Sequence, residues 1–120
     1  KNTIKVTRCD CSRPNSAGGV DVYINFTNTS DKTIKYAYFT VEPYNAVGDI
    51  VESEVGNRTT AICTDTGPYG PEEGHYGTSW YWDCIWYNST IVRIKLTKIR
   101  IEYTDGTQTS ISGDDIQYVW

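Results

Sequence analysis

The sequence predicts a single all-β domain spanning residues 1–120, an immunoglobulin-like antiparallel β-sandwich of about seven to nine short strands. A chain of 120 residues suits one hydrophobic core. Ten Tyr and four Trp accompany a single Leu and no Met, a composition that favours strands over helices. Short segments of alternating apolar and polar residues are separated by clusters of Gly, Asn, Asp and Pro, which are typical of turns.

The first three strands follow from a period of two. Residues 3–9 alternate in this way, and residues 20–27 do so again after a turn at residues 14–19. A polar turn at residues 28–32 precedes a third strand at residues 33–44. Apolar or aromatic side chains on both faces of this third strand predict a central position in its sheet.

The middle of the chain is richer in turn residues. A turn at residues 45–49 is followed by an expected short strand at residues 50–55 and a further strand at residues 58–64. Residues 66–78 contain four Gly and two Pro between Gly67 and Gly77. Because both residue types weaken regular structure, we expect an exposed loop there.

The last third of the chain returns to strands. After an aromatic strand at residues 79–87, the apolar positions of residues 92–103 change parity, which predicts a β-bulge near Thr97 and Lys98. Asp105 and Gly106 predict a hairpin with a type I′ turn that leads into a strand at residues 108–111. After a turn at residues 112–115, the tail at residues 116–120 is expected to add an edge strand.

The charge and hydropathy patterns argue against two classes of partner. The net charge is −4 and the eleven basic residues are scattered, so no nucleic-acid partner is expected. No apolar run approaches the roughly 20 residues of a membrane-spanning helix, so we expect no membrane insertion by this segment. The chain begins at Lys1 without a signal peptide, which predicts a segment whose targeting sequence has been removed.

Four cysteines indicate an oxidising environment. Cys9, Cys11, Cys63 and Cys84 are an even number in a small chain, which favours disulfides and an extracellular or cell-envelope location. Cys9 and Cys11 are two residues apart, near the upper distance limit for a bridge on a strand. We therefore expect two long-range bridges, each joining one of this pair to Cys63 or Cys84. The alternative is that some of the four are reduced and packed.

Neither a metal site nor a catalytic group is expected. The cysteines and His75 lack the two closely spaced ligand pairs of zinc sites, and no Asp-rich calcium loop is present, so we predict no metal and no cofactor. His75 is the only histidine and has no nucleophile at a known motif spacing. We predict a protein that is not an enzyme. An enzyme would be considered again if the fold placed His75 beside a carboxylate or a thiolate in a cleft.

The aromatic strand at residues 79–87 has two possible interpretations. Trp80, Trp82 and Trp86 share one face with Cys84, and we favour placing this face in the core. Tyr81 and Tyr87 point the other way. The alternative is an exposed platform on which a sugar or peptide lies, made of the tyrosines Tyr69, Tyr76, Tyr81 and Tyr87.

Several segments resemble a known group of domains. Residues 15–22, 28–36, 41–49, 86–91 and 94–106 are similar to small immunoglobulin-like domains of unknown function from surface and lipoprotein-like chains of gut Gram-positive bacteria. A broader likeness is to FxLYD-type modules, whose namesake motif corresponds here to residues 41–45. The resemblance implies an immunoglobulin-like fold, a bacterial cell envelope and a non-enzymatic role, and it carries over no ligand residues.

These observations together predict a binding or spacer module outside the cell. Its partner is expected to be an unidentified protein or glycan at the cell surface. The alternative function is that of a carbohydrate-binding accessory domain, which uses the exposed tyrosine and tryptophan face because flat aromatic rings suit the apolar faces of sugars.

Overall fold

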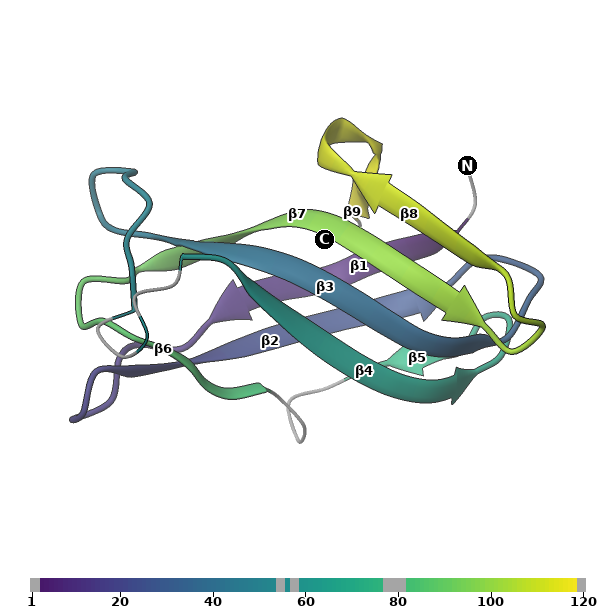
Figure 1. Cartoon of the computed structure of the whole chain (residues 1–120), viewed down its shortest axis with the longest axis horizontal. Coiled ribbons are helices and arrows are strands. Elements are labelled where there is room, and N and C mark those ends of the chain that lie inside the picture. The colour runs from purple at the N-terminus through teal and green to yellow at the C-terminus, as the bar shows by residue number, and fades with distance from the viewer. Residues whose placement is uncertain (1–2, 54–55, 57–58, 77–81, 119–120) are drawn as a thin grey trace.

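Apolar residues at every second position give the long strands one buried and one solvent-facing side. In the computed structural model, which describes residues 3–53, 56, 59–76 and 82–118, this alternation is clearest in β2 (Gly19–Asn28) and β3 (Ile34–Tyr44). Nine strands are found in these residues, and they form two sheets packed face to face (Figure 1). The predicted all-β sandwich is confirmed.

The two sheets use different strands of the chain. One sheet has the order β9-β1-β2, and β5 and β6 pair with opposite ends of the remaining edge of β2. The other has the order β4-β3-β7-β8, so β3 has a partner on each side, as predicted for a central strand. The bounds not yet given are β1 (Ile4–Cys11), β4 (Ala61–Tyr69), β5 (Gly74–His75), β6 (Trp82–Tyr87), β7 (Arg93–Tyr103), β8 (Gln108–Ser112) and β9 (Gln117–Tyr118).

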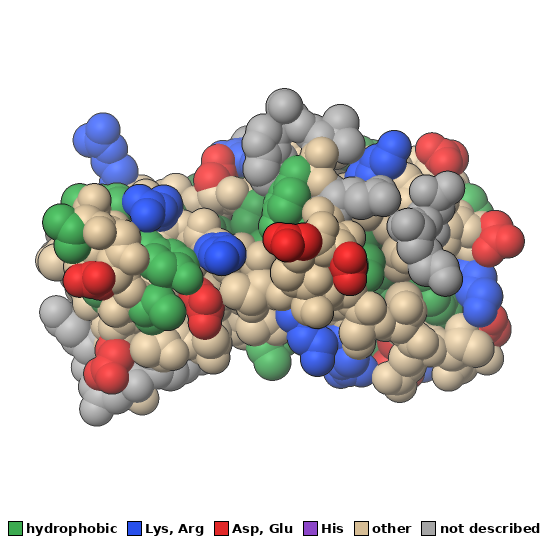
Figure 2. Space-filling model, turned by 90° about the horizontal axis from the view of Figure 1, so that it is seen from above, with side chains coloured by type: hydrophobic (Ala, Val, Ile, Leu, Met, Phe, Trp, Pro, Cys, Tyr) green, Lys and Arg blue, Asp and Glu red, His purple; other side chains and the backbone are tan. Residues whose placement is uncertain are grey.

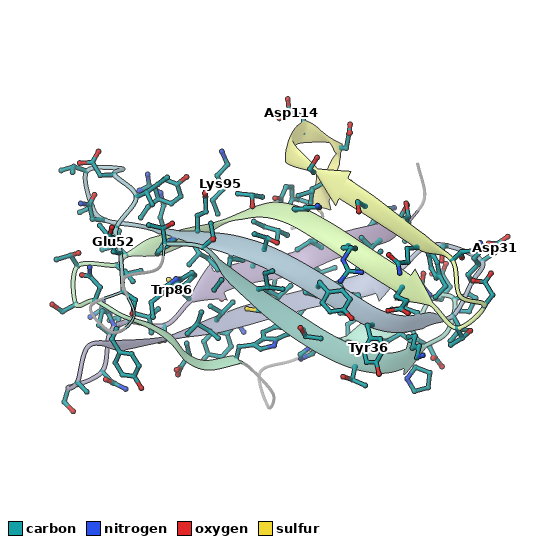
Figure 3. All side chains as sticks on the ribbon, viewed as in Figure 1. Asp31, Tyr36, Glu52, Trp86, Lys95 and Asp114 are labelled. Carbon is teal, nitrogen blue, oxygen red and sulfur yellow. The ribbon has the colours of Figure 1, made fainter. Side chains whose placement is uncertain are left out.

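The core lies between the sheets. Its largest fully buried side chains are Trp86, Phe26 and Phe39. Trp82 packs against the same core, so the tryptophan side of the aromatic strand faces inward at its two described positions, as favoured from the sequence. Trp80 lies outside the described residues. Figure 3 shows Trp86 between the ribbons of the two sheets.

The predicted bulge in β7 is confirmed. Thr40 pairs with Lys98 and the next residue, Val41, pairs with Leu96, so Thr97 is the extra residue. The Thr97 hydroxyl donates a hydrogen bond of 3.2 Å to the carbonyl oxygen of Thr40. The inserted residue keeps Leu96 and Ile99 buried although they are three positions apart.

The hairpin predicted at Asp105 and Gly106 is present, but the predicted type I′ turn is wrong. Such a turn needs positive φ at both central residues, whereas Gly106 (φ 89°) has a positive φ and Asp105 does not. The amide of Gly106 donates to the carbonyl of Tyr103, and the amide of Tyr103 donates to that of Thr107. This is a three-residue loop with a glycine bulge, which suits the same Asp-Gly sequence.

Two loops of the sandwich share one turn design. Asn15 and Asn45 each accept, at the side-chain oxygen, the amides of the residues two and four positions later. Gly18 and Gly48 follow three positions after these asparagines with φ of 85° and 89°. The asparagine begins each turn and the glycine supplies the left-handed residue that closes it.

The exposed loop predicted at residues 66–78 is wrong in part. β4 continues through Gly67 and Pro68 to Tyr69, and β5 forms at Gly74 and His75. Gly67 is required because a Cβ there would overlap the carbonyl oxygen of Ile34. β4 is an edge strand of its sheet, and edge strands tolerate glycine and proline.

Three further predicted segments differ in their bounds or geometry. The strand expected at residues 50–55 is reduced, in its described part, to a single bridge between Ile50 and Tyr44. The strand expected at residues 58–64 begins at Ala61. The expected tail strand is β9, which runs parallel to β1, whereas the other strand pairs are antiparallel; a short 3-10 helix, η1 (Gly113–Asp115), precedes it.

Candidate functional site

The four tyrosines of the predicted platform do not share one surface. Tyr69 and Tyr76 both line one cavity of about 510 Å³ at the edge of the sandwich. Tyr87 pairs with Gly19 at the opposite end of β2 from Phe26, which pairs with β5. Seven residues of extended strand separate these two ends by about 23 Å. Tyr81 lies outside the described residues.

Tyr69 and Tyr76 also differ in exposure. Tyr76 is 55% exposed, and its hydroxyl lies 3.2 Å from the Thr27 hydroxyl. The Tyr69 ring packs edge-on against Phe26, with 5.1 Å between ring centroids, and its hydroxyl donates to Asp65 at 2.7 Å. Tyr69 therefore belongs as much to the interior as to the cavity.

The fold places His75 beside a carboxylate. Nδ1 of His75 on β5 lies 2.9 Å from Oδ2 of Asp65 on β4, and the two residues are 7% and 3% exposed. With the Tyr69 hydroxyl on the other carboxylate oxygen, three side chains form one buried polar network next to the cavity. This is the arrangement that the sequence left open as the mark of an enzyme.

The backbone at β5 is held close enough for this contact by a glycine. A Cβ on Gly74 would overlap the carbonyl oxygen of Phe26 on β2. The absence of a side chain lets β5 pair with β2 and bring His75 over the end of the core. His75 then stacks in a tilted geometry beside Trp82, with 5.9 Å between centroids.

The His75 side of the network is enclosed. The Nε2 atom of His75 exposes less than 1 Å² of surface, so a molecule in the cavity does not reach this nitrogen in the structure. Burial, the hydrogen bond to Asp65 and the charge of Asp65 raise the pKa of the Tyr69 phenol. The network joins an edge strand of one sheet to an edge strand of the other, which fixes their separation.

A second candidate surface is the outer face of the β4-β3-β7-β8 sheet, which we call the tyrosine face. Tyr36 and Tyr38 point outward from β3 with ring centroids 6.1 Å apart. The guanidinium of Arg100 on β7 stacks over Tyr38 at 4.0 Å from the ring centroid. Tyr38 pairs with Thr64 of β4 on its other side. No described element covers this face, which is turned toward the viewer in Figure 1.

The tyrosine face and the cavity are continuous. Thr64 and Thr66 point outward from β4, pair with Tyr38 and Tyr36 respectively, and also line the cavity that contains Tyr76. Figure 3 shows Tyr36 on the near side of the sheet. Hydroxyl groups and aromatic rings therefore extend from the centre of the sheet to its edge.

The outer face of the other sheet offers a smaller version of the same pairing. Arg8 stacks over Tyr23 with 4.6 Å to the ring centroid. Arg8 also forms an ion pair of 3.0 Å with Asp10 on the same strand. A single tyrosine and a neutralised arginine make this a useful comparison for the tyrosine face.

Sequence reasoning missed the tyrosine face, although a signal for it was present. The tyrosines at positions 36 and 38 alternate with the buried Ala37 and Phe39. We interpreted the apolar bulk on both sides only as evidence for a central strand. The second side is in fact open to solvent rather than covered by another layer.

The two long-range disulfides predicted from the sequence are not formed. Cys9 and Cys11 on β1 are thiols, and no disulfide joins Cys9, Cys11 or Cys63 to one another. Cys63 lies on β4, in the opposite sheet from β1, and is fully buried. Both cysteines of β1 pack against the core. The side chain of Cys84, on β6, lies outside the described residues.

Burial controls the chemistry of the two thiols on β1. Desolvation, followed by the charge of Asp10, raises the pKa of Cys9 to about 12 and that of Cys11 to about 11. A thiol needs its thiolate form to react or to bind metal. Within the described residues, no group of three His, Cys, Asp or Glu side chains is arranged to hold a metal ion.

Comparison with known proteins adds no relative to this picture. No protein-family model matches the chain, and no curated protein or solved structure gives a significant match. In the described part of the chain, no helix has the length and apolar character needed to cross a membrane.

Proposed function

We propose that this chain is a non-catalytic binding module and that its ligand lies on the tyrosine face. The observation that carries the proposal is the pair Tyr36 and Tyr38, held side by side on a central strand with Arg100 stacked over one ring. Both rings are half-buried on the outer side of the sheet, and aromatic rings held on a rigid sheet supply contact area at little entropic cost. The threonines of β4 add hydroxyl groups for hydrogen bonds at the rim.

The buried network supports a non-catalytic role. A general base must reach the proton it removes, directly or through one water molecule. The Nε2 atom of His75 is enclosed and Nδ1 is engaged by Asp65. Linkage of the two sheets accounts for these side chains without a reaction.

A spacer role receives less support. The parallel pairing of Lys5 with Gln117 puts the first and last strands next to each other. A polypeptide continuing in both directions would enter along β1 and leave along β9, two adjacent strands about 5 Å apart. Such a domain adds little length between its neighbours, which suits the display of a surface better than the separation of two neighbours.

The extracellular or cell-envelope location remains part of the proposal. The disulfide argument for it is weakened by the thiols of Cys9 and Cys11. A surface built from tyrosine, threonine and arginine is compatible with a glycan or protein ligand at the cell surface.

The test is a glycan and peptide array probed with the wild-type chain, the Tyr36→Ala/Tyr38→Ala double variant and a Tyr23→Ala control. Tyr23 carries a similar arginine contact on the opposite sheet. We expect binding to at least one ligand class, its loss in the double variant and its retention in the control. A blank array, or binding that survives the double substitution, would overturn the proposal. Circular dichroism confirms that each variant is folded.

A further inference from the structure

Basic residues are concentrated on the tyrosine face. It presents five of the eleven basic residues of the chain and two of the fifteen acidic ones, although the whole chain has a net charge of −4. The basic residues are Lys35, Arg93, Lys95, Lys98 and Arg100. The acidic ones are Glu42 and Glu102. The remainder of the molecule is strongly acidic, and Figure 2 shows acidic and basic side chains interspersed on an adjoining side.

The bulge at Thr97 contributes to this concentration. Without an extra residue, Lys95 and Lys98 would point to opposite faces of β7 because three positions separate them. With Thr97 inserted, Lys95, Lys98 and Arg100 are all outside while Leu96 and Ile99 are buried. The bulge therefore joins two parts of the strand into one row of positive charge.

The row of charge runs beside the aromatic rings. Arg100 pairs with Tyr38 in the strand register, and Lys98 pairs with Thr40, the next outward residue of β3. Lys35 adds a positive charge at the other end, with Nζ 5.5 Å from the centroid of Tyr36. A ligand that covers both rings thus meets cations beside Tyr38 and beyond Tyr36, and one carboxylate, that of Glu102, which is the strand partner of Tyr36.

We propose that the tyrosine face binds an acidic polysaccharide whose rings carry carboxylates. Its sugar rings stack on Tyr36 and Tyr38, and its carboxylates pair with Arg100 and Lys98. Arginine is suited to this role because its planar group stacks on an aromatic ring and still offers a fork of donors to a carboxylate. This inference rests on the proposed function and names the ligand class for the same surface.

Other acidic partners fit the surface less well. A peptide epitope usually needs an apolar pocket for an anchoring side chain, whereas the apolar residue most exposed on this face is Ile62, on the edge strand β4. Nucleic-acid-binding domains are generally basic as a whole, and this chain is acidic. A carboxylated glycan combines stackable rings with a moderate density of charge.

The experiment compares two polymers with the same sugar ring. Binding of polygalacturonate and of its fully methyl-esterified form is measured by biolayer interferometry in 50 and 500 mM NaCl. We expect the charged polymer to bind at least tenfold more tightly at low salt, and this preference to shrink at high salt because the ion pairs are screened. Poly-glutamate and oligo-deoxythymidine serve as competitors.

Matched charge variants locate the site. Lys98→Gln/Arg100→Gln should weaken polygalacturonate binding by at least tenfold, whereas Lys5→Gln/Arg8→Gln, on the other sheet, should change it by less than twofold. Both double variants remove two positive charges, so the comparison isolates position from net charge.

The outcomes separate the two proposals. Equal binding of both polymers that still depends on Tyr36 and Tyr38 would overturn the acidic ligand and leave the proposed function standing. If poly-glutamate or oligo-deoxythymidine competes more strongly than polygalacturonate, an acidic polypeptide or a nucleic acid is the better ligand, and this inference is likewise overturned. If neither polymer binds, but ligands on the array bind and require Tyr36 and Tyr38, only the inference of an acidic polysaccharide is contradicted. If no ligand loses binding when Tyr36 and Tyr38 are replaced, both the proposed function and the inference are overturned.

Discussion

Asp65 and His75 join the two sheets of the sandwich at its edge. Their 2.9 Å contact links β4, an edge strand of one sheet, to β5, which pairs with the outer side of β2 in the other. Main-chain hydrogen bonds hold strands within a sheet but not between sheets. A buried polar contact of this kind therefore adds a directional link between the sheets, as do the hydrogen bonds from the Trp82 indole to the Thr64 carbonyl oxygen and from the Tyr118 hydroxyl to that of Leu96.

The first prediction concerns this link. Asp65→Ala leaves the His75 ring nitrogen and the Tyr69 hydroxyl facing an apolar gap, so the free energy of unfolding should fall by roughly 3–5 kcal/mol. Asp10→Ala removes an exposed carboxylate that pairs with Arg8, and it should cost less than about 1 kcal/mol. Urea denaturation of both variants makes the comparison. Similar losses in the two would show that the network contributes no more than a surface ion pair.

The second prediction concerns alkaline stability. The pKa of Cys9 is raised to about 12 and that of Cys11 to about 11, from an ordinary value of 9.0, mainly by burial. The unfolded chain thus releases these protons at a lower pH than the folded chain. Keeping the two thiols protonated therefore stabilises the folded state. This contribution to the free energy of unfolding is complete below pH 9 and is lost as the pH rises toward 12.

Urea denaturation between pH 8 and 11.5 measures this effect. The wild-type chain should lose stability steadily over the range, and Cys9→Ala/Cys11→Ala should show a shallower decline because two of the titrating groups are gone. Tyr69 contributes to the remaining slope, because its raised pKa acts in the same direction. Superimposable profiles would contradict the assignment of the effect to the two thiols.

The third prediction concerns the aromatic core. Trp86 is fully buried and its indole nitrogen donates to the Thr59 carbonyl at 3.0 Å. Trp86→Ala should lower the free energy of unfolding by about 3–5 kcal/mol, because it leaves a large cavity. Ile62→Ala, at a side chain that is 64% exposed, should change it by less than about 0.5 kcal/mol. Thermal unfolding followed by circular dichroism ranks the two, and a reversed order would place Trp86 outside the core.

The fourth prediction isolates a backbone effect. Gly106 has φ of 89°, and a Cβ added there meets nothing within 4 Å. Gly106→Ala should therefore cost about 1–2 kcal/mol through backbone strain alone. Gly106→Asn should cost less, because asparagine tolerates left-handed backbone. Chemical denaturation tests the order, and equal losses would mean that the hairpin adopts another turn in the variants.

Local pattern was sufficient for much of the fold. The alternation in β2 and β3 defines their buried faces, and the parity change in β7 predicts the extra residue at Thr97. These features depend on neighbours along one strand, so they are readable from the sequence. The part of β4 after Thr64 and the short strand β5 were missed because glycine and proline there are tolerated only through their edge positions, which depend on the sheet order.

The sequence by itself determined an all-β chain, its bulge, the position of its last hairpin and the inward direction of Trp86. The tertiary structure alone decided that Asp65 and His75 meet, that Cys9 and Cys11 form no disulfide with Cys63, and that Tyr36 and Tyr38 face outward beside Arg100. The reason is physical. Each of these relationships depends on how different strands are arranged. The order of strands in a sheet and the packing of one sheet on the other bring distant strands together, but they leave no periodic pattern in the sequence.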